Sequence, residues 1–62
     1  MSDYIYQQAG IYDRTPGGVL RHVRSYLGKA VIEFNEFNFK EAKRQVELAV
    51  KLTEALHIEL GL

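Results

Sequence analysis

The chain has 62 residues, of which 47% are hydrophobic, and its eight Lys and Arg balance eight Asp and Glu. A domain of this size buries only about 60% of its unfolded surface, and with no Cys it has no disulfide to stabilise it. The zero net charge excludes a general attraction to nucleic acid or an anionic membrane. We therefore expect one small domain that gains stability by self-association.

Residues 1–14 are predicted to form an irregular N-terminal arm. Apolar residues occur there without a sustained helical period, and Gly10 is placed as a helix breaker. Because disordered tails are poor in aromatic residues, this arm should pack on something, either the core of the chain itself or an apolar groove. Its apolar members are Tyr4, Ile5, Tyr6, Ile11 and Tyr12.

A first helix is predicted over residues 16–37. Thr15 is a suitable N-cap, and Pro16 fits the first helical position, where its missing N–H is not needed. Apolar residues then recur at alternating spacings of three and four, which predicts a seam that faces a second helix. The seam consists of Leu20, Val23, Leu27, Ala30, Phe34 and Phe37.

The residues after this helix are predicted to turn the chain back on itself. Asn38 can cap a second helix over residues 39–60, and Glu41 is placed to complete a capping box with it. Phe37 and Ala42 are spaced as a hydrophobic staple. So short a connection makes the two helices antiparallel neighbours.

The second helix is predicted to carry two apolar stripes, of which the first helix can cover only one. The uncovered stripe would be an exposed apolar patch, and such patches mark contact surfaces. We therefore predict an all-α antiparallel helical hairpin, residues 15–62, that assembles as a dimeric four-helix bundle through the second stripe. The first stripe is Ala42, Val46, Ala49, Leu56 and Leu60, and the second is Leu48, Leu52 and Ala55.

No pattern typical of an enzyme or a cofactor site occurs in the sequence. The glycine-rich phosphate-binding motifs and the H-E-x-x-H zinc motif are missing, and Gly17 and Gly18 follow a proline at a helix start. His22 and His57 have no Cys and no obvious carboxylate with which to complete a metal site. We expect no catalysis, cofactor or metal. The lack of a membrane span or a signal peptide favours a cytoplasmic location.

Three features resemble the FliS family of flagellin export chaperones. The arm with its tyrosines and Gln7 and Gln8 is similar to the arm of that family, and Thr15-Pro16-Gly17 resembles its helix start. The second helix resembles the second hairpin helix of the family, whose members are longer and complete a four-helix bundle within one chain. The matching positions are Phe39, Ala42, Ala49, Leu52, Leu56 and Leu60.

This resemblance implies a cytoplasmic chaperone-like protein or adaptor that binds an amphipathic helix of flagellin or of another secreted client. It also implies that the arm occupies the client site until the client displaces it, which lowers the apparent affinity. A homodimer is the form expected to bind. The expected partner-binding residues are Tyr4, Ile5, Tyr6, Leu48, Leu52 and Ala55.

Two other functional interpretations remain open. The second helix also resembles a tetratricopeptide-type helix at Ala42 and Ala49, which would make the chain a self-assembling structural or regulatory hairpin. A nucleic-acid-binding hairpin dimer could use Arg21, Arg24 and Lys29. Because acidic residues follow immediately, a solvated helix face explains these basic residues more simply. We therefore expect neither nucleic acid nor a membrane among the partners.

Overall fold

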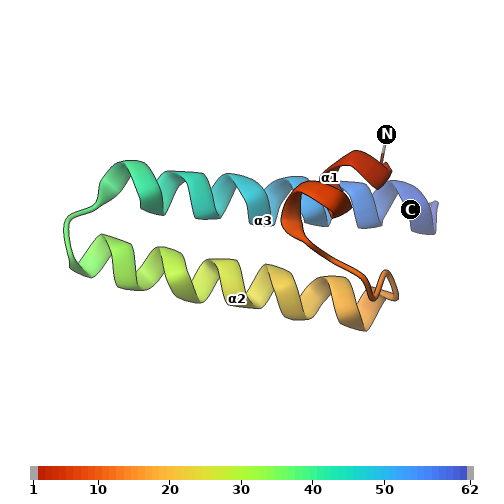
Figure 1. Ribbon diagram of the computed structural model, residues 1–62, viewed down its shortest axis with the longest axis horizontal. Helices are drawn as coiled ribbons and strands as arrows, with labels where there is room; N and C mark the ends of the chain where they lie inside the picture. The colour runs from red at the N-terminus through yellow and green to blue at the C-terminus, as the bar shows by residue number, and fades with distance from the viewer. Residues whose placement is uncertain (1, 62) are drawn as a thin grey trace.

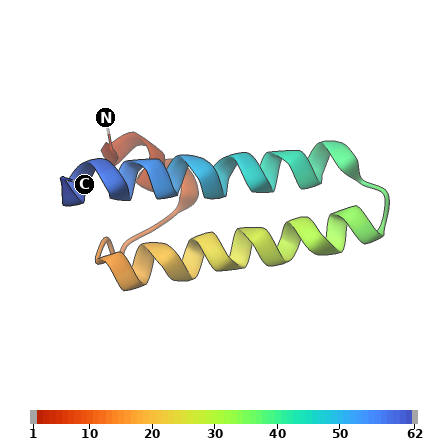
Figure 2. The ribbon, with the colours of Figure 1, turned by 180° about the vertical axis from the view of Figure 1, so that it is seen from behind.

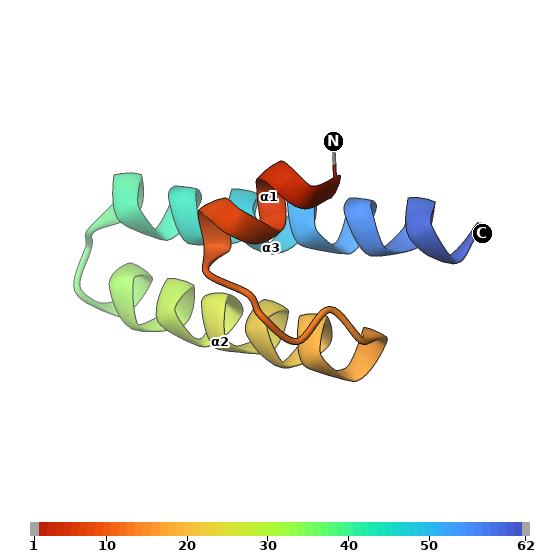
Figure 3. The same ribbon diagram turned by 45° about the vertical axis from the view of Figure 1, so that its right-hand side comes forward.

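The computed structural model describes residues 2–61, with side chains from residue 4 onward, so that Met1 and Leu62 lie outside the described residues. Two long helices form an antiparallel hairpin, and a short one lies against it near the open end (Figure 1, Figure 3). The predicted all-α hairpin is therefore confirmed. The helices are α1 (Ser2–Ala9), α2 (Pro16–Asn35) and α3 (Phe39–Leu60).

The start of α2 follows the prediction. The hydroxyl of Thr15 accepts a hydrogen bond from the backbone N–H of Gly18 at 3.2 Å, and Pro16 opens the helix. The same hydroxyl and the backbone N–H of Thr15 donate to the Asp13 carboxylate at 2.7 and 3.1 Å. These two hydrogen bonds lower the pKa of Asp13. The loop therefore approaches the first turn of α2 closely, and Gly18 leaves room for it.

The end of α2 differs from the prediction, because the helix stops at Asn35. The N–H of Phe37 donates to the carbonyl of Phe34 at 3.1 Å, and that of Asn38 donates to the carbonyl of Glu33 at 2.8 Å. This Schellman pair satisfies carbonyls that a helix end leaves unpaired, and it needs a left-handed residue that is usually glycine. Phe37 takes that position with φ 62°. The predicted continuation to residue 37 was wrong because phenylalanine is not a residue type that indicates the end of a helix.

The predicted capping box before α3 is also wrong. Asn38 precedes the helix, but its side chain makes no capping hydrogen bond and donates instead to the Glu33 carboxylate at 2.9 Å. Glu41 accepts hydrogen bonds from Arg44 at 3.2 Å and from Gln45 at 2.9 Å. These two hydrogen bonds lower the pKa of Glu41, and they bind its carboxylate to side chains three and four residues later in α3. Both members of the expected box therefore have other partners.

Three phenylalanines gather at the closed end of the hairpin. The ring centre of Phe39 lies 5.8 Å from that of Phe34 and 6.1 Å from that of Phe37. All three side chains are about half exposed or more. Phe37 was predicted to form a staple with Ala42, and this is wrong because Phe37 is 78% exposed and its ring lies edge-on to Phe39.

The N-terminal arm was predicted to be irregular, and this is wrong because residues Ser2–Ala9 form α1. The helix ends in a second Schellman pair, in which Ile11 N–H donates to the Tyr6 carbonyl at 2.9 Å. Gly10 takes the left-handed position with φ 70°, as its predicted role of breaker requires. Eight residues are too few to show a helical period or to hold a helix in water, so only its packing reveals α1.

The core lies near the open end of the hairpin, where α1 joins the other two helices (Figure 1). Of the predicted α2 seam, Ala30 is buried and Val23 partly buried. Leu20, Leu27 and Phe34 are each about half exposed, so most of the predicted seam is not buried against α3. The core cluster consists of Tyr6, Ile11, Val19, Leu52, Ala55 and Leu56.

α2 packs along α3, and residues of α1 contact it through side chains. Val19, Tyr26 and Ala30 lie four or seven residues apart and share one side of the helix. Val19 is fully buried, and the Tyr26 hydroxyl donates to the carbonyl of Ala9, the last residue of α1, at 3.0 Å. The seam prediction failed because it assumed a single partner helix, whereas α1, which packs on α3, also buries side chains of α2. No helix in the described part of the chain is long and apolar enough to cross a membrane.

Candidate functional site

α1 is held against the hairpin by its central tyrosine. Tyr6 is fully buried, and its hydroxyl donates to the Glu59 carboxylate at 3.0 Å. The guanidinium of Arg14 lies over the same ring, 5.2 Å from its centre, at cation–π distance. The Tyr26 hydroxyl meets a carbonyl that the end of α1 leaves unpaired, that of Ala9. One buried ring and a few polar contacts therefore fix α1 in place.

The predicted second stripe of α3 lies largely beneath α1. Leu52 is fully buried and Ala55 is 8% exposed, in one cluster with Tyr6. The prediction that this stripe is left uncovered is therefore wrong at both positions, because α1 supplies the covering helix. Leu48 is half-buried and lines a separate hollow of about 150 Å³ beside Gln8.

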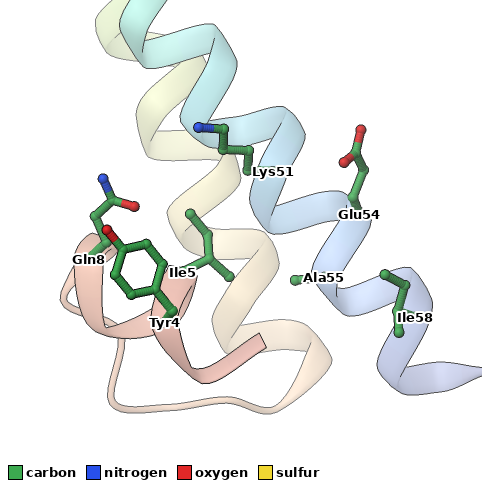
Figure 4. A pocket seen from close by; sticks show the side chains of 7 residues that line it. All are labelled: Tyr4, Ile5, Gln8, Lys51, Glu54, Ala55 and Ile58. Atoms are coloured by element: carbon green, nitrogen blue, oxygen red, sulfur yellow. The ribbon is translucent and has the colours of Figure 1, made fainter. Parts of the chain in front are cut away.

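A groove of about 350 Å³ opens between α1 and α3 (Figure 4). Tyr4 and Ile5 line it from α1, and Ala55 and Ile58 line it from α3. Tyr4 is 70% exposed and Ile58 76% exposed, so the groove offers apolar contact to a partner. The polar residues that line it are Gln8, Lys51 and Glu54.

Half of the predicted partner-binding residues meet in this groove, namely Tyr4, Ile5 and Ala55. Tyr6 and Leu52 belong to the core instead, where they connect α1 to α3. The prediction missed four lining residues of the groove. Lys51 lies four residues before Ala55 and Ile58 three residues after it, and this helical spacing is the signal that could have found these two. The missed residues are Gln8, Lys51, Glu54 and Ile58.

The charges and ligating groups around the groove are few. Lys51 and Glu54 balance each other, so the groove has no net charge to select a polyanion. Within the described side chains, no group of three or more His, Asp or Glu is arranged to hold a metal ion. His22 is half-buried on α2, whereas His57 is exposed on α3. The surface offers a binding partner mainly apolar contact.

Comparison of the chain with models of protein families, with curated proteins and with solved structures finds no match in any of the three. The geometry of the site is therefore the basis for a functional interpretation. α1 docks on α3 beside an open apolar groove, and an apolar groove of this kind is one type of surface on which proteins bind amphipathic helices.

Proposed function

We propose that the protein is a small chaperone-like adaptor that binds an amphipathic helix of a client protein on α3, in the place where α1 lies. The docking of α1 supports this proposal, because a short helix with apolar residues already covers this surface. A client helix with apolar residues at helical spacing would cover Leu52 and Ala55 as α1 does, and its outer side would reach Ile58.

α1 competes with the client in this proposal. Its docking depends on a single large buried ring, that of Tyr6, and its eight residues are below the length at which an isolated helix is stable. A client that binds only when α1 is detached has an apparent affinity lowered by the fraction of molecules in the detached state. α1 thereby covers an apolar surface until a client binds, and it determines how strongly a client must bind in order to displace it.

The resemblance of the sequence to the FliS flagellin export chaperones supports a flagellar or other secreted client and a cytoplasmic place of action. We propose further that the protein acts as a homodimer in which the two hairpins form a four-helix bundle. The length of the chain supports this form, because a core of this size gains much of its stability from association.

The test is a titration of the full chain with a fluorescent synthetic peptide of the C-terminal helical segment of flagellin, with a scrambled peptide as control. Tyr6→Phe keeps the buried ring and removes the hydrogen bond to Glu59, which is worth about 1 kcal/mol. The detached population then rises, and the apparent affinity should increase about 5-fold. Tyr12→Phe, at a side chain that is 98% exposed, should leave the affinity unchanged.

Three outcomes would count against the proposal. Failure of the peptide to bind either the wild type or Tyr6→Phe refutes a flagellar client. Equal affinity for both proteins refutes competition with α1. Binding that disappears at raised salt points to an ionic partner, since phosphate contacts weaken steeply with ionic strength whereas apolar contacts do not.

A further inference from the structure

Seen from behind, α2 and α3 have no covering helix within residues 2–61 (Figure 2), and both helices carry large apolar side chains that are about half exposed. On α2 these side chains recur at spacings of seven, four and three, which places them on one side of the helix. Two more on α3 lie eleven residues apart and also share a side. Each is between 45% and 59% exposed. We call this surface the bare face: Leu20, Leu27, Val31, Phe34, Phe39 and Val50.

A groove of about 250 Å³ joins the two helices across this face. Val23 and Leu27 line it from α2, and Ala49, Val50 and Thr53 line it from α3. The apolar rows on both sides of the groove therefore form one surface that is two helices wide. A single added helix would fill the groove and leave the outer row on each side exposed.

We infer that the bare face is the contact surface for a second copy of this chain, with α2 of each copy packed against α3 of the other. This inference gives the proposed homodimer its interface and rests on that part of the proposed function. It does not depend on the client site, which lies on the α1 side of the hairpin. A hairpin matches the width of the face, and every neighbouring pair of helices in the resulting bundle is antiparallel.

The exposed area supports this occupant. The accessible surface of the chain is 4677 Å², whereas a compact monomer of 7.1 kDa is expected to expose about 4,100 Å². The six half-exposed side chains of the bare face present on the order of 600 Å² per copy. With its polar rim the face approaches the roughly 800 Å² per partner that a standard interface buries.

The rim of the bare face carries opposite charges on its two helices. Arg24 follows Leu20 by one turn on α2, and Glu54 on α3 lines this groove as well as the groove beside α1. Val23 and Thr53 line the same groove, and they lie 14 and 16 residues from Phe37 in the turn, so they have similar levels along the antiparallel helices. A two-fold axis parallel to the helices leaves every residue at the same position along that axis. When α2 of one copy faces α3 of the other, Arg24 therefore lies close to Glu54 of the second copy. Charge complementarity thus favours this arrangement over one that pairs like helices.

The test compares two neighbouring residues on α2. Val31 is 59% exposed and belongs to the bare face, whereas Ile32 is 57% exposed and points about 100° away from it. Both residues are β-branched and exposed in the single chain, so an aspartate at either position should leave the hairpin folded. Circular dichroism of each variant checks this.

Sedimentation equilibrium of the full chain should give twice 7.1 kDa for the wild type and for Ile32→Asp. Val31→Asp buries two unpaired charges per dimer, and its dissociation constant should rise at least about 100-fold. A wild type that remains a monomer at roughly 100 µM overturns the inference, as does a Val31→Asp protein that dimerises as tightly as the wild type.

A charge exchange tests the arrangement of the two copies. Arg24→Glu and Glu54→Arg should each weaken the dimer roughly 3- to 10-fold, and the double variant should restore it. Single variants without effect overturn the pairing of α2 with α3. Binding of the flagellin peptide by Val31→Asp is measured separately, so that a failed interface and a failed client site give different results.

Discussion

The two ends of the hairpin are built in different ways. At the open end, Tyr6, Val19 and Leu52 have no exposed surface and pack together with residues from all three helices. Toward the closed end, the buried apolar contacts of the two long helices come from alanines such as Ala30 and Ala42. The large aromatic residues of that end lie outside the contact and are about half exposed or more.

This difference shows that the fold depends on the place where α1 joins the hairpin. Burial of a large apolar side chain contributes about 1.5–3 kcal/mol, and an alanine contributes less because it removes less surface from water. The closed end is held instead by backbone hydrogen bonds around Phe37. The helix that completes the core is also the shortest one, so the element that stabilises the chain is also the one most easily detached.

The largest effect should come from the core at the open end. Leu52→Ala removes a fully buried side chain and should lower the free energy of unfolding by about 2–5 kcal/mol. Leu60→Ala, in the last turn of α3 and 51% exposed, should cost less than about 1 kcal/mol. Urea unfolding followed by circular dichroism measures both. Equal losses would show that the open end is not the centre of stability.

The next effect concerns the two glycines at the start of α2. A Cβ on Gly18 would lie 2.5 Å from Asp13 Cγ and 2.6 Å from the Asp13 carbonyl oxygen, so Gly18→Ala should cost about 1–3 kcal/mol. Gly17 has no atom within 4 Å of its Cβ position, so Gly17→Ala should be neutral or stabilise by up to about 1 kcal/mol. Thermal unfolding should give a lower melting temperature for Gly18→Ala and an unchanged or higher one for Gly17→Ala. A similar decrease for both variants would contradict this packing.

A smaller effect is expected at the closed end. Phe37 is in the left-handed region with φ 62°, where a side chain is unfavourable, so Phe37→Gly should raise the free energy of unfolding by about 0.5–1 kcal/mol. Asn35→Gly, at the last helical residue of α2, should lower it by a similar amount. Chemical unfolding of both variants checks the prediction. Destabilisation by Phe37→Gly would mean that the ring of Phe37 contributes more than its backbone conformation costs.

The smallest effect concerns pH. Hydrogen bonds from Thr15 hold the pKa of Asp13 below its ordinary value of 3.8, so the unfolded chain binds a proton more readily than the folded one. The contribution of this carboxylate is present above about 3.8 and is lost as the pH falls through the lowered value. The melting temperature of Asp13→Asn should therefore fall less than that of the wild type between about pH 5 and about pH 2. Parallel curves would refute this role.

Much of the hairpin could be predicted because its signals are local. Thr15 and Pro16 mark the start of α2, and α3 has the predicted bounds Phe39–Leu60. The end of α2 could not be predicted in the same way, because Phe37 holds a backbone conformation that normally identifies glycine. α1 was missed because its stability comes from the buried ring of Tyr6 rather than from its own sequence.

The candidate site could be predicted only in part, for a related reason. Leu52 and Ala55 were predicted to lie on a stripe that α2 leaves uncovered, but they are buried in one cluster with residues of α1 and α2. Their partner could not be identified from periodicity, since it is a helix of the same chain. Once α1 covers that stripe, Leu27 and Val31 on the other side of α2 are the side chains left exposed. An error about one short helix therefore placed the predicted dimer contact on residues that α1 helps to bury.

The proposed function depends most on the displacement of α1 by a client helix. Amide hydrogen exchange tests this displacement most directly, with the full chain measured free and saturated with the flagellin peptide. The free chain should protect the Ile11 amide, which donates to the Tyr6 carbonyl at the end of α1. With the peptide bound, protection of α1 and of Ile11 should disappear while the amides of α2 and α3 remain protected. Protection of α1 that is unchanged or increased by the peptide would contradict the claim.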